Sequence, residues 1–197
     1  MRVLVGCEFS GVVRDTFIKA GHDAWSCDYL PSDKPGPHYQ CDIRNVEKMD
    51  WDIGIFFPPC KYICNGGNNW LNRRPDLKWR ENRDKAANFF MRLVNFEIPR
   101  IAIENPIGCM STRYRKPDQI IRPFMFGHPY NKDVCLWLKN LPKLVPTNVI
   151  PGPYKHLDFW STERHKGGRD VKAITFQGIA DAMAEQWGNL DKQEQHP

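Results

Sequence analysis

Four short apolar runs, each ended by a glycine, an acidic residue or a proline, divide the first 106 residues of the chain. They are RVLVG (2–6), AWSCD (24–28), DIGIFF (52–57) and RIAIEN (100–105). Runs of this length are typical of buried β-strands, because a strand covered on both faces needs no alternation of polar residues. The pattern predicts a sheet whose strands are separated by longer segments.

Helical patterns occupy two of those segments. Apolar residues at 12, 13, 17 and 20 predict a helix that Gly21 ends, and a second helix is expected from about 80 to 96, after a Gly/Asn/Pro-rich loop at 61–79. A short strand around 39–43 completes the order β-α-β-β-β-α-β, which implies right-handed crossovers. The fold class that follows is α/β, with a single Rossmann-like, doubly wound, mostly parallel sheet.

Beyond Pro106 the pattern is looser. The run at 133–138 predicts a further strand, and 174–187 should contain a closing helix. Between them lies an extended connection interrupted by prolines at 141–153. The sequence contains no internal repeat and no low-complexity tract, so we expect one domain over residues 1–197.

Composition excludes several classes of protein. No apolar run approaches the roughly 18 residues of a membrane-spanning helix, and the N-terminus lacks the long apolar region of a signal peptide. The seven cysteines are an odd number without paired spacing, which fits a reducing compartment better than a disulfide scaffold. A cytoplasmic location without a membrane partner is therefore expected.

Charge is distributed unevenly along the chain. Residues 1–60 carry 6 basic and 9 acidic side chains, whereas residues 61–197 carry 22 basic and 14 acidic ones. The basic residues are mixed with aromatic ones in two segments: Arg73, Arg74, Lys78, Arg80, Arg83 and Lys85 with Trp70 and Trp79, and Arg113, Arg115, Lys116 and Arg122 with Tyr114. This mixture suits a nucleic acid whose bases stack on the rings. The alternative is a solvated helix face beside core tryptophans.

The loop Gly6–Gly11 joins the first strand to the first helix, where open α/β sheets bind ligands. It lacks the G-x-G-x-x-G fingerprint, and Val12-Val13 replaces the Lys-Ser/Thr of a phosphate loop, so NAD and ATP are both disfavoured. Asp28 and Asp42 end the next two predicted strands. A glycine loop with two strand-end acids indicates a nucleoside-containing cofactor and no metal. Alternatively, Gly11 serves close packing and the acids cap helices.

Two further strand ends carry reactive side chains. In Phe57-Pro58-Pro59-Cys60 the prolines stiffen the turn and direct the Cys60 thiol, a nucleophile for a soft conjugated carbon, at the sheet edge. Glu104 ends the strand before Pro106, where a carboxyl group could hold a heterocycle's ring nitrogen and amine. The alternatives are a structural cysteine and a capping or arginine-paired glutamate. Zinc is not expected, because no second Cys/His pair accompanies Cys60 and Cys64.

The order EFSG, PPC, ENP resembles that of the DNA cytosine-5 methyltransferase family. Phe9-Ser10-Gly11 matches the start of its F-x-G-x-G motif, with Val13 in place of the later glycine. Pro58-Pro59-Cys60 matches its catalytic Pro-Pro-Cys, and Glu104-Asn105 matches its Glu-Asn-Val with Pro106 in place of valine. The segment FQGIADAMAEQW resembles the last motif of the family, and the WST and GHP elements resemble short phage or prophage members.

The resemblance implies a methyltransferase-type sheet that binds S-adenosylmethionine. In this family Cys60 would add to C6 of cytosine, while Glu104 stabilises the protonated N3 and the methyl group goes to C5. The residues implied for the cofactor are Gly6, Glu8, Phe9, Ser10, Gly11, Asp28, Tyr29, Asp42 and Pro58. Those implied for substrate are Pro59, Asn105, Arg113 and Arg115, the two arginines by a loose match to Q-x-R-x-R with Ser111 in place of glutamine.

By the same resemblance, residues 1–106 would form the cofactor and catalytic core, 107–172 a reduced substrate-binding region and 173–190 a helix that packs back on the core. The family's large target-recognition domain has little room here, since only about 140–170 lie in its place. The implied partner is DNA, single-stranded or loosely specified, in a bacterial or phage-infected cell. RNA, a free nucleotide such as dCMP, recognition through a homodimer or a specificity partner, and a non-catalytic nucleic-acid-binding role remain alternatives.

Overall fold

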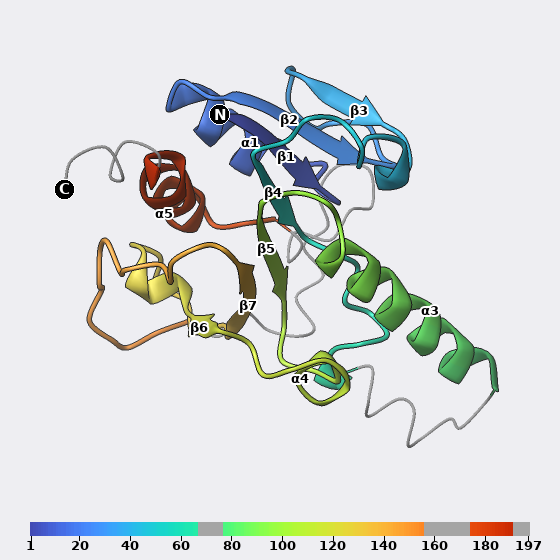
Figure 1. The fold of residues 1–197 in the computed structure, drawn as a ribbon. Helices are drawn as coiled ribbons and strands as arrows, with labels where there is room; N and C mark the ends of the chain where they lie inside the picture. Colours follow the sequence, from blue (N-terminus) through green and yellow to red (C-terminus); the bar gives the residue numbers. More distant parts are fainter. Residues whose placement is uncertain (67–76, 156–173, 191–197) are drawn as a thin grey trace.

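The computed structural model describes residues 1–66, 77–155 and 174–190, and within these ranges seven strands form one sheet (Figure 1). The strands are β1 (Arg2–Gly6), β2 (Asp23–Asp28), β3 (His38–Gln40), β4 (Ile53–Phe56), β5 (Arg100–Asn105), β6 (Gln119–Ile121) and β7 (Val134–Lys139). Their spatial order is β3-β2-β1-β4-β5-β7-β6. The first five strands pair in parallel, and β7 runs antiparallel to both of its neighbours.

The strand order reverses direction between β1 and β4, which are neighbours in the sheet although β2 and β3 lie between them in sequence. Gly6 lies opposite Phe56 at the carboxyl ends of this pair, so the loops that follow both strands leave the sheet side by side. The Phe57 amide donates to the Gly6 carbonyl at 3.0 Å. A reversal of this kind opens a crevice in which α/β proteins bind ligands.

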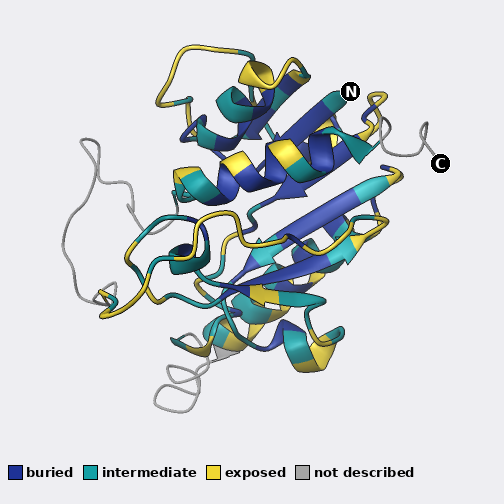
Figure 2. Cartoon of the chain, turned by 90° about the vertical axis from the view of Figure 1, so that its left-hand side faces the viewer, coloured by how far each residue is buried: buried dark blue, intermediate teal, exposed yellow. Residues whose placement is uncertain are grey.

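Helices cover both faces of the sheet (Figures 1 and 2). Val3 and Val5 of β1 belong to the core beneath α1 (Val12–Lys19) and α5 (Gln177–Gly188), whereas Leu4 points to the other core, beneath α3 (Leu77–Val94). This alternation follows from the two-residue period of a strand. Both faces are apolar because both are buried, which explains the continuous apolar runs in the sequence.

This arrangement is an α/β fold with a Rossmann-like, doubly wound sheet, in which β7 runs antiparallel to its neighbours. The predicted fold class and the mostly parallel sheet are confirmed. No helix within the described ranges is long and apolar enough to cross a membrane.

Several predicted elements have different bounds in the structure, among them β3 and α3. The strand expected at 39–43 is β3 (His38–Gln40), because the Asp42 carboxylate accepts the Arg44 amide and begins a 3-10 turn at Ile43–Asn45. The helix expected from about 80 to 96 is α3, which begins at Leu77 and ends at Val94. Of the loop predicted at 61–79, residues 67–76 lie outside the described ranges and 77–79 are helical.

Besides the 3-10 turn at Ile43–Asn45, the sequence pattern did not predict three further short elements or the direction of β7. They are α4 (Met110–Arg113), β6 and a 3-10 turn at Pro123–Met125. Elements of three or four residues carry too little periodicity to be recognised, and here partners distant in sequence define them. β6, for example, exists through its pairing with β7.

Candidate active site

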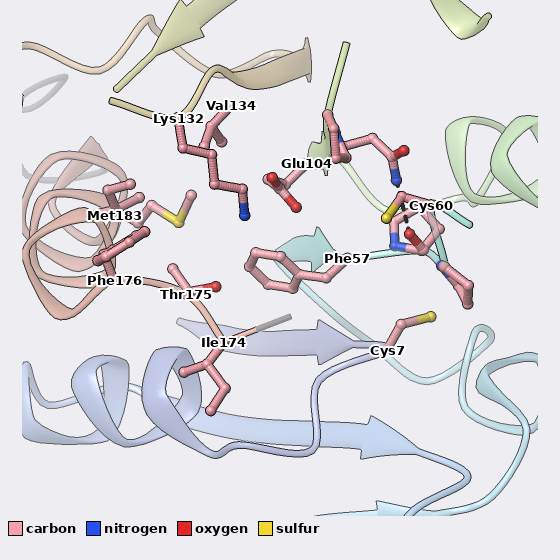
Figure 3. Close-up of a pocket in the computed structure, with 15 residues that line it drawn as sticks. Cys7, Phe57, Cys60, Glu104, Lys132, Val134, Ile174, Thr175, Phe176 and Met183 are labelled. Carbon is pink, nitrogen blue, oxygen red and sulfur yellow. Dashed lines mark hydrogen bonds between the residues drawn. The ribbon is translucent and has the colours of Figure 1, made fainter. Parts of the chain in front are cut away.

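A pocket of about 120 Å³ lies at the carboxyl edge of the sheet and brings Cys60 and Glu104 together (Figure 3). Its other lining residues come from the loop after β1 (Cys7), the turn after β4 (Phe57, Pro58, Pro59), the end of β5 (Asn105, Pro106), the start of β7 (Lys132, Val134) and the entry to α5 (Ile174, Thr175, Phe176, Ile179, Met183). Pockets for drug-sized ligands typically measure about 300–1,000 Å³. This one therefore suits a single ring better than a whole nucleotide cofactor.

Hydrogen bonds before and after Cys60 fix the turn that follows β4. The buried Asn105 amide donates to the Pro58 carbonyl at 2.8 Å, which ties this turn to the end of β5. The Cys60 carbonyl then accepts the amides of Ile63 (3.0 Å) and Cys64 (2.9 Å), so one helical turn begins at the cysteine. The two prolines restrict the backbone between these points. Asn105, predicted to contact substrate, therefore also positions the nucleophile's turn.

The surroundings of the Cys60 thiol favour its neutral form. Its pKa is raised first by a hydrogen bond with Cys64, then by burial and by the charges of Cys64 and Glu104, while Lys132 acts in the opposite direction. A thiol with a raised pKa is a weak nucleophile until its proton is removed. Within the described ranges, no three His, Cys, Asp or Glu side chains are grouped so as to hold a metal ion.

Glu104 combines burial with a nearby cation. The residue is half-buried at the end of β5, and burial raises the pKa of its carboxyl group, with Lys132 opposing this effect. Such a carboxyl group keeps its proton to a higher pH than an exposed glutamate does. It is suited to exchange a proton with a bound heterocycle.

Lys132 is a pocket residue that the sequence analysis missed. Because β7 is antiparallel to β5 and Cys135 lies opposite Asn105, the start of β7 reaches the edge where the parallel strands end. Lys132 precedes β7 by two residues, and Figure 3 shows its side chain extending into the pocket towards Glu104. The signal in the sequence was a lysine directly before the apolar run at 133–138. This lysine could be assigned to the pocket only once β7 was known to run antiparallel to β5.

Replacing the lysine should make Cys60 less reactive. In Lys132→Met we expect alkylation of Cys60 by iodoacetamide at pH 8 to slow about tenfold, because loss of a nearby cation raises the thiol pKa and leaves less thiolate to react. Peptide mapping by mass spectrometry at several pH values separates Cys60 from the other cysteines. The exposed Lys143, replaced in the same way, should leave the rate unchanged. Equal alkylation rates in the two variants would show that Lys132 does not influence the pKa of the Cys60 thiol.

The predicted cofactor loop Gly6–Gly11 adjoins this pocket through Cys7. Gly11 has φ 74°, which favours glycine, and a Cβ there would lie 2.6 Å from the Arg14 guanidinium. Glu8 is 5% exposed, and its Oε1 accepts hydrogen bonds from the Ser10 hydroxyl and the Val12 amide. Its Oε2 is buried and has no hydrogen-bond partner among the described residues. This orphaned acceptor fits a ligand that carries a cationic nitrogen.

The two predicted acids differ in their surroundings. Asp28 is half-buried at the end of β2, and its Oδ1 accepts the Leu30 amide at 2.9 Å. Asp42 accepts hydrogen bonds from the Tyr29 hydroxyl and the Arg44 guanidinium, and the bonds from Arg44 contribute most to lowering its pKa. Asp28 thus fits a hydroxyl-bearing ligand at the end of its strand, whereas Asp42 and Tyr29 already bind each other.

The remaining predicted substrate residues are dispersed. Arg113 forms an ion pair with Asp84 of α3 at 2.6 Å. Arg115 pairs with Asp118 at 2.7 Å and donates to the Leu138 carbonyl. Neither arginine is among the residues that line the pocket, whereas Pro59 is. Their contacts with substrate stay a prediction, and Trp70, Arg73 and Arg74 lie outside the described residues.

Comparison with known proteins finds likeness only in structure. Neither a protein-family model nor a curated protein matches the sequence. An E. coli protein described as a DNA modification methyltransferase encoded within a prophage is similar at a TM-score of 0.49 and 14% identity, over 77% of this chain and 52% of that one. The Entamoeba histolytica methyltransferase EhMeth is similar at a TM-score of 0.48 and 14% identity, over 76% of this chain and 57% of that one. A Spodoptera frugiperda DNMT2 mutant is similar at a TM-score of 0.44 and 13% identity, over 79% of this chain and 56% of that one. The chain spans about half the length of these proteins.

Proposed function

We propose that the chain is an S-adenosylmethionine-dependent methyltransferase that transfers a methyl group to C5 of cytosine in DNA. The observation that carries this proposal is the pocket in which Cys60, Glu104 and Lys132 meet at the ends of β4, β5 and the start of β7. A thiol beside a carboxyl group that can protonate a ring nitrogen is the pair needed for addition to a pyrimidine.

The chemistry begins with the thiol. As the Cys60 sulfur adds to C6, its proton passes to Glu104, whose charge is near enough to raise the thiol pKa. Glu104 then gives the proton to N3, and the electron pair of the former C5–C6 double bond becomes available at C5. Lys132 stabilises the carboxylate and the thiolate between these steps, since it lowers the pKa of both groups.

The second half of the reaction restores the aromatic ring. S-Adenosylmethionine, when bound, would supply the methyl group that C5 takes, and its sulfur would keep the electron pair of the bond that breaks. A base removes the C5 proton, the C6–sulfur bond breaks, and N3 returns its proton to Glu104. Glu104 passes that proton on to the departing Cys60 sulfur, so the carboxylate and the thiol are both restored, and the proton from C5 leaves with the base.

The cofactor would lie beside this pocket, in the crevice between β1 and β4. S-Adenosylmethionine supplies the methyl group on a sulfonium that is activated for transfer. Its ammonium suits the unpartnered Oε2 of Glu8, and its ribose hydroxyls suit the carboxylate of Asp28. Pro58 lines the pocket at the boundary between the two regions.

Asp28 gives the cofactor site a direct test. In Asp28→Ala we expect S-adenosylmethionine to bind about 1–3 kcal/mol more weakly, because a charge-assisted hydrogen bond to the ribose is lost. Isothermal titration calorimetry measures the change. The matched control is Asp50→Ala, an exposed acid at the opposite edge of the sheet, which should bind the cofactor like the parent. If Asp28→Ala also binds like the parent, another residue holds the ribose.

The covalent step can be trapped. DNA that carries 5-fluorocytosine has no C5 proton to lose, so the Cys60–C6 bond should persist after methyl transfer. We expect a protein–DNA adduct whose mass and proteolytic fragments place the bond at Cys60, and whose formation requires S-adenosylmethionine. Methyl transfer to ordinary cytosine without an adduct on fluorinated DNA would exclude the covalent mechanism.

A further inference from the structure

A pair of aromatic side chains stands directly beside the nucleophile's turn. The rings of Tyr62 and Trp79 meet at a centroid distance of 4.7 Å and an interplanar angle of 69°. The Lys61 ammonium lies 5.4 Å from the centroid of the Tyr62 ring. Together with the exposed Lys78 and Arg80 we call these five residues the aromatic–basic surface.

The fold builds this surface from two segments. Lys61 and Tyr62 belong to the helical turn that Cys60 begins, so they follow the nucleophile without interruption. Trp79 comes from the first turn of α3, and Figure 1 shows that this end of the helix projects away from the sheet. The aromatic pair therefore includes a residue of the same helical turn as Cys60, which lines the pocket.

The aromatic pair takes no part in the core. The other described tryptophans pack in one of the two core clusters: Trp187 in that of α1 and α5, and Trp25, Trp51 and Trp137 in that of α3. Tyr62 and Trp79 belong to neither cluster, although both are half-buried. Packing of the core therefore does not explain why two large rings stand together here.

The charge of the surroundings is positive. Lys61, Lys78 and Arg80 are exposed, and Arg83, one turn further along α3, has a buried Nε without a hydrogen-bond partner among the described residues. Two acids lie on the same part of the helix, Glu81 and Asp84, and Asp84 is neutralised by Arg113. Lys61 lies over the Tyr62 ring, and the exposed Lys78 and Arg80 flank Trp79 in sequence. Exposed cations next to aromatic residues match the phosphates and base faces of a polynucleotide.

We propose that the aromatic–basic surface binds the unpaired DNA strand next to the target cytosine, with neighbouring bases stacked on Tyr62 and Trp79 and phosphates held by Lys61, Lys78 and Arg80. Unpaired DNA is the occupant because the base faces of a duplex are covered by their own neighbours, whereas a single strand offers them to aromatic rings. The inference rests on the proposed function for the base in the pocket and adds the form of DNA that the protein binds.

Binding of a fluorescently labelled mixed-sequence 12-mer, followed by anisotropy without cofactor, tests the proposal. We expect Tyr62→Leu and Trp79→Leu each to weaken single-strand binding about 5- to 150-fold, the effect of losing one stacked base. Tyr62→Phe keeps the ring and should bind like the parent. Lys78→Gln with Arg80→Gln should reduce the slope of log affinity against log salt by about 1.4, since each lost cation contributes about 0.7 on a single strand.

Matched variants outside the surface serve as controls. One control is Tyr39→Leu, since Tyr39 stacks on Trp25 at the far side of the sheet. The other is the double variant Lys48→Gln with Lys143→Gln, which removes two exposed cations elsewhere. These variants should bind the 12-mer like the parent. Circular dichroism and thermal unfolding show whether Tyr62→Leu and Trp79→Leu keep the native fold.

The outcomes separate this proposal from the proposed function. If the Tyr62→Leu and Trp79→Leu variants are folded and bind the 12-mer with unchanged affinity, the aromatic–basic surface does not bind DNA, even if the parent methylates DNA. Equal losses on a duplex of the same sequence would overturn the preference for unpaired DNA. Loss of binding confined to the single strand supports the surface whether or not methyl transfer is detected, because the measurement needs neither cofactor nor chemistry.

Discussion

Cys60→Ala is expected to reduce methyl transfer to background while leaving the fold and the affinity for S-adenosylmethionine intact. Without the sulfur no bond to C6 can form, and C5 of cytosine stays too poor a nucleophile to accept the methyl group. The alanine methyl group occupies the same place at the start of the helical turn, so the backbone bonds of the Cys60 carbonyl to Ile63 and Cys64 are kept. Transfer of labelled methyl groups to DNA and calorimetry with the cofactor measure the two properties.

Cys64→Ala is the matched control for this prediction. Cys64 raises the pKa of the Cys60 thiol by a hydrogen bond and by its charge, so its removal should lower that pKa and preserve or increase activity at neutral pH. If Cys60→Ala stays active, or if Cys64→Ala is the inactive variant, Cys60 is not the nucleophile.

Glu104→Gln should lower turnover by about 10²- to 10⁴-fold, the usual contribution of a general acid–base group. The amide is close in size to the carboxyl group and can still form hydrogen bonds, but it cannot pass a proton from the Cys60 thiol to N3. Single-turnover kinetics with saturating cofactor isolate this step from product release. An unchanged rate would assign the proton transfer to another group.

The same variant should change the pH dependence of stability. Glu104 ionises near pH 4.5 in the unfolded chain, and burial raises its pKa in the folded one. Its favourable contribution is thus complete below pH 4.5 and is lost as the pH rises towards the folded pKa. Thermal unfolding should show Glu104→Gln gaining stability relative to the parent as the pH rises above about 4.5. A constant difference over this range would contradict a raised pKa.

The central part of the fold could be predicted because its signals are local. The runs at 2–6 and 100–105 became β1 and β5 with the predicted bounds, since strands buried on both faces need apolar residues throughout. The meeting of Cys60 and Glu104 followed from the same pattern, because parallel neighbouring strands end at one edge. Two residues distant in sequence were in this way predicted to share a site.

What the sequence did not reveal depends on partners distant in the chain. Lys132 enters the pocket only because β7 is antiparallel to β5, and no local pattern shows that direction. The pairing of Tyr62 with Trp79 requires the turn after Cys60 and the start of α3 to come together in space. Likewise, the ion pair of Asp42 with Arg44 became visible only when the short 3-10 turn at Ile43–Asn45 was known.

Transfer of labelled methyl groups from S-adenosylmethionine tests the central claim most directly. The substrates are mixed-sequence DNA in single-stranded and duplex form, with dCMP and RNA beside them and Cys60→Ala as the control protein. We predict 5-methylcytosine in the DNA digest, dependent on Cys60, and none in the control. Label on dCMP or RNA but not on DNA, or label on DNA at any position other than C5 of cytosine, would contradict the proposed function.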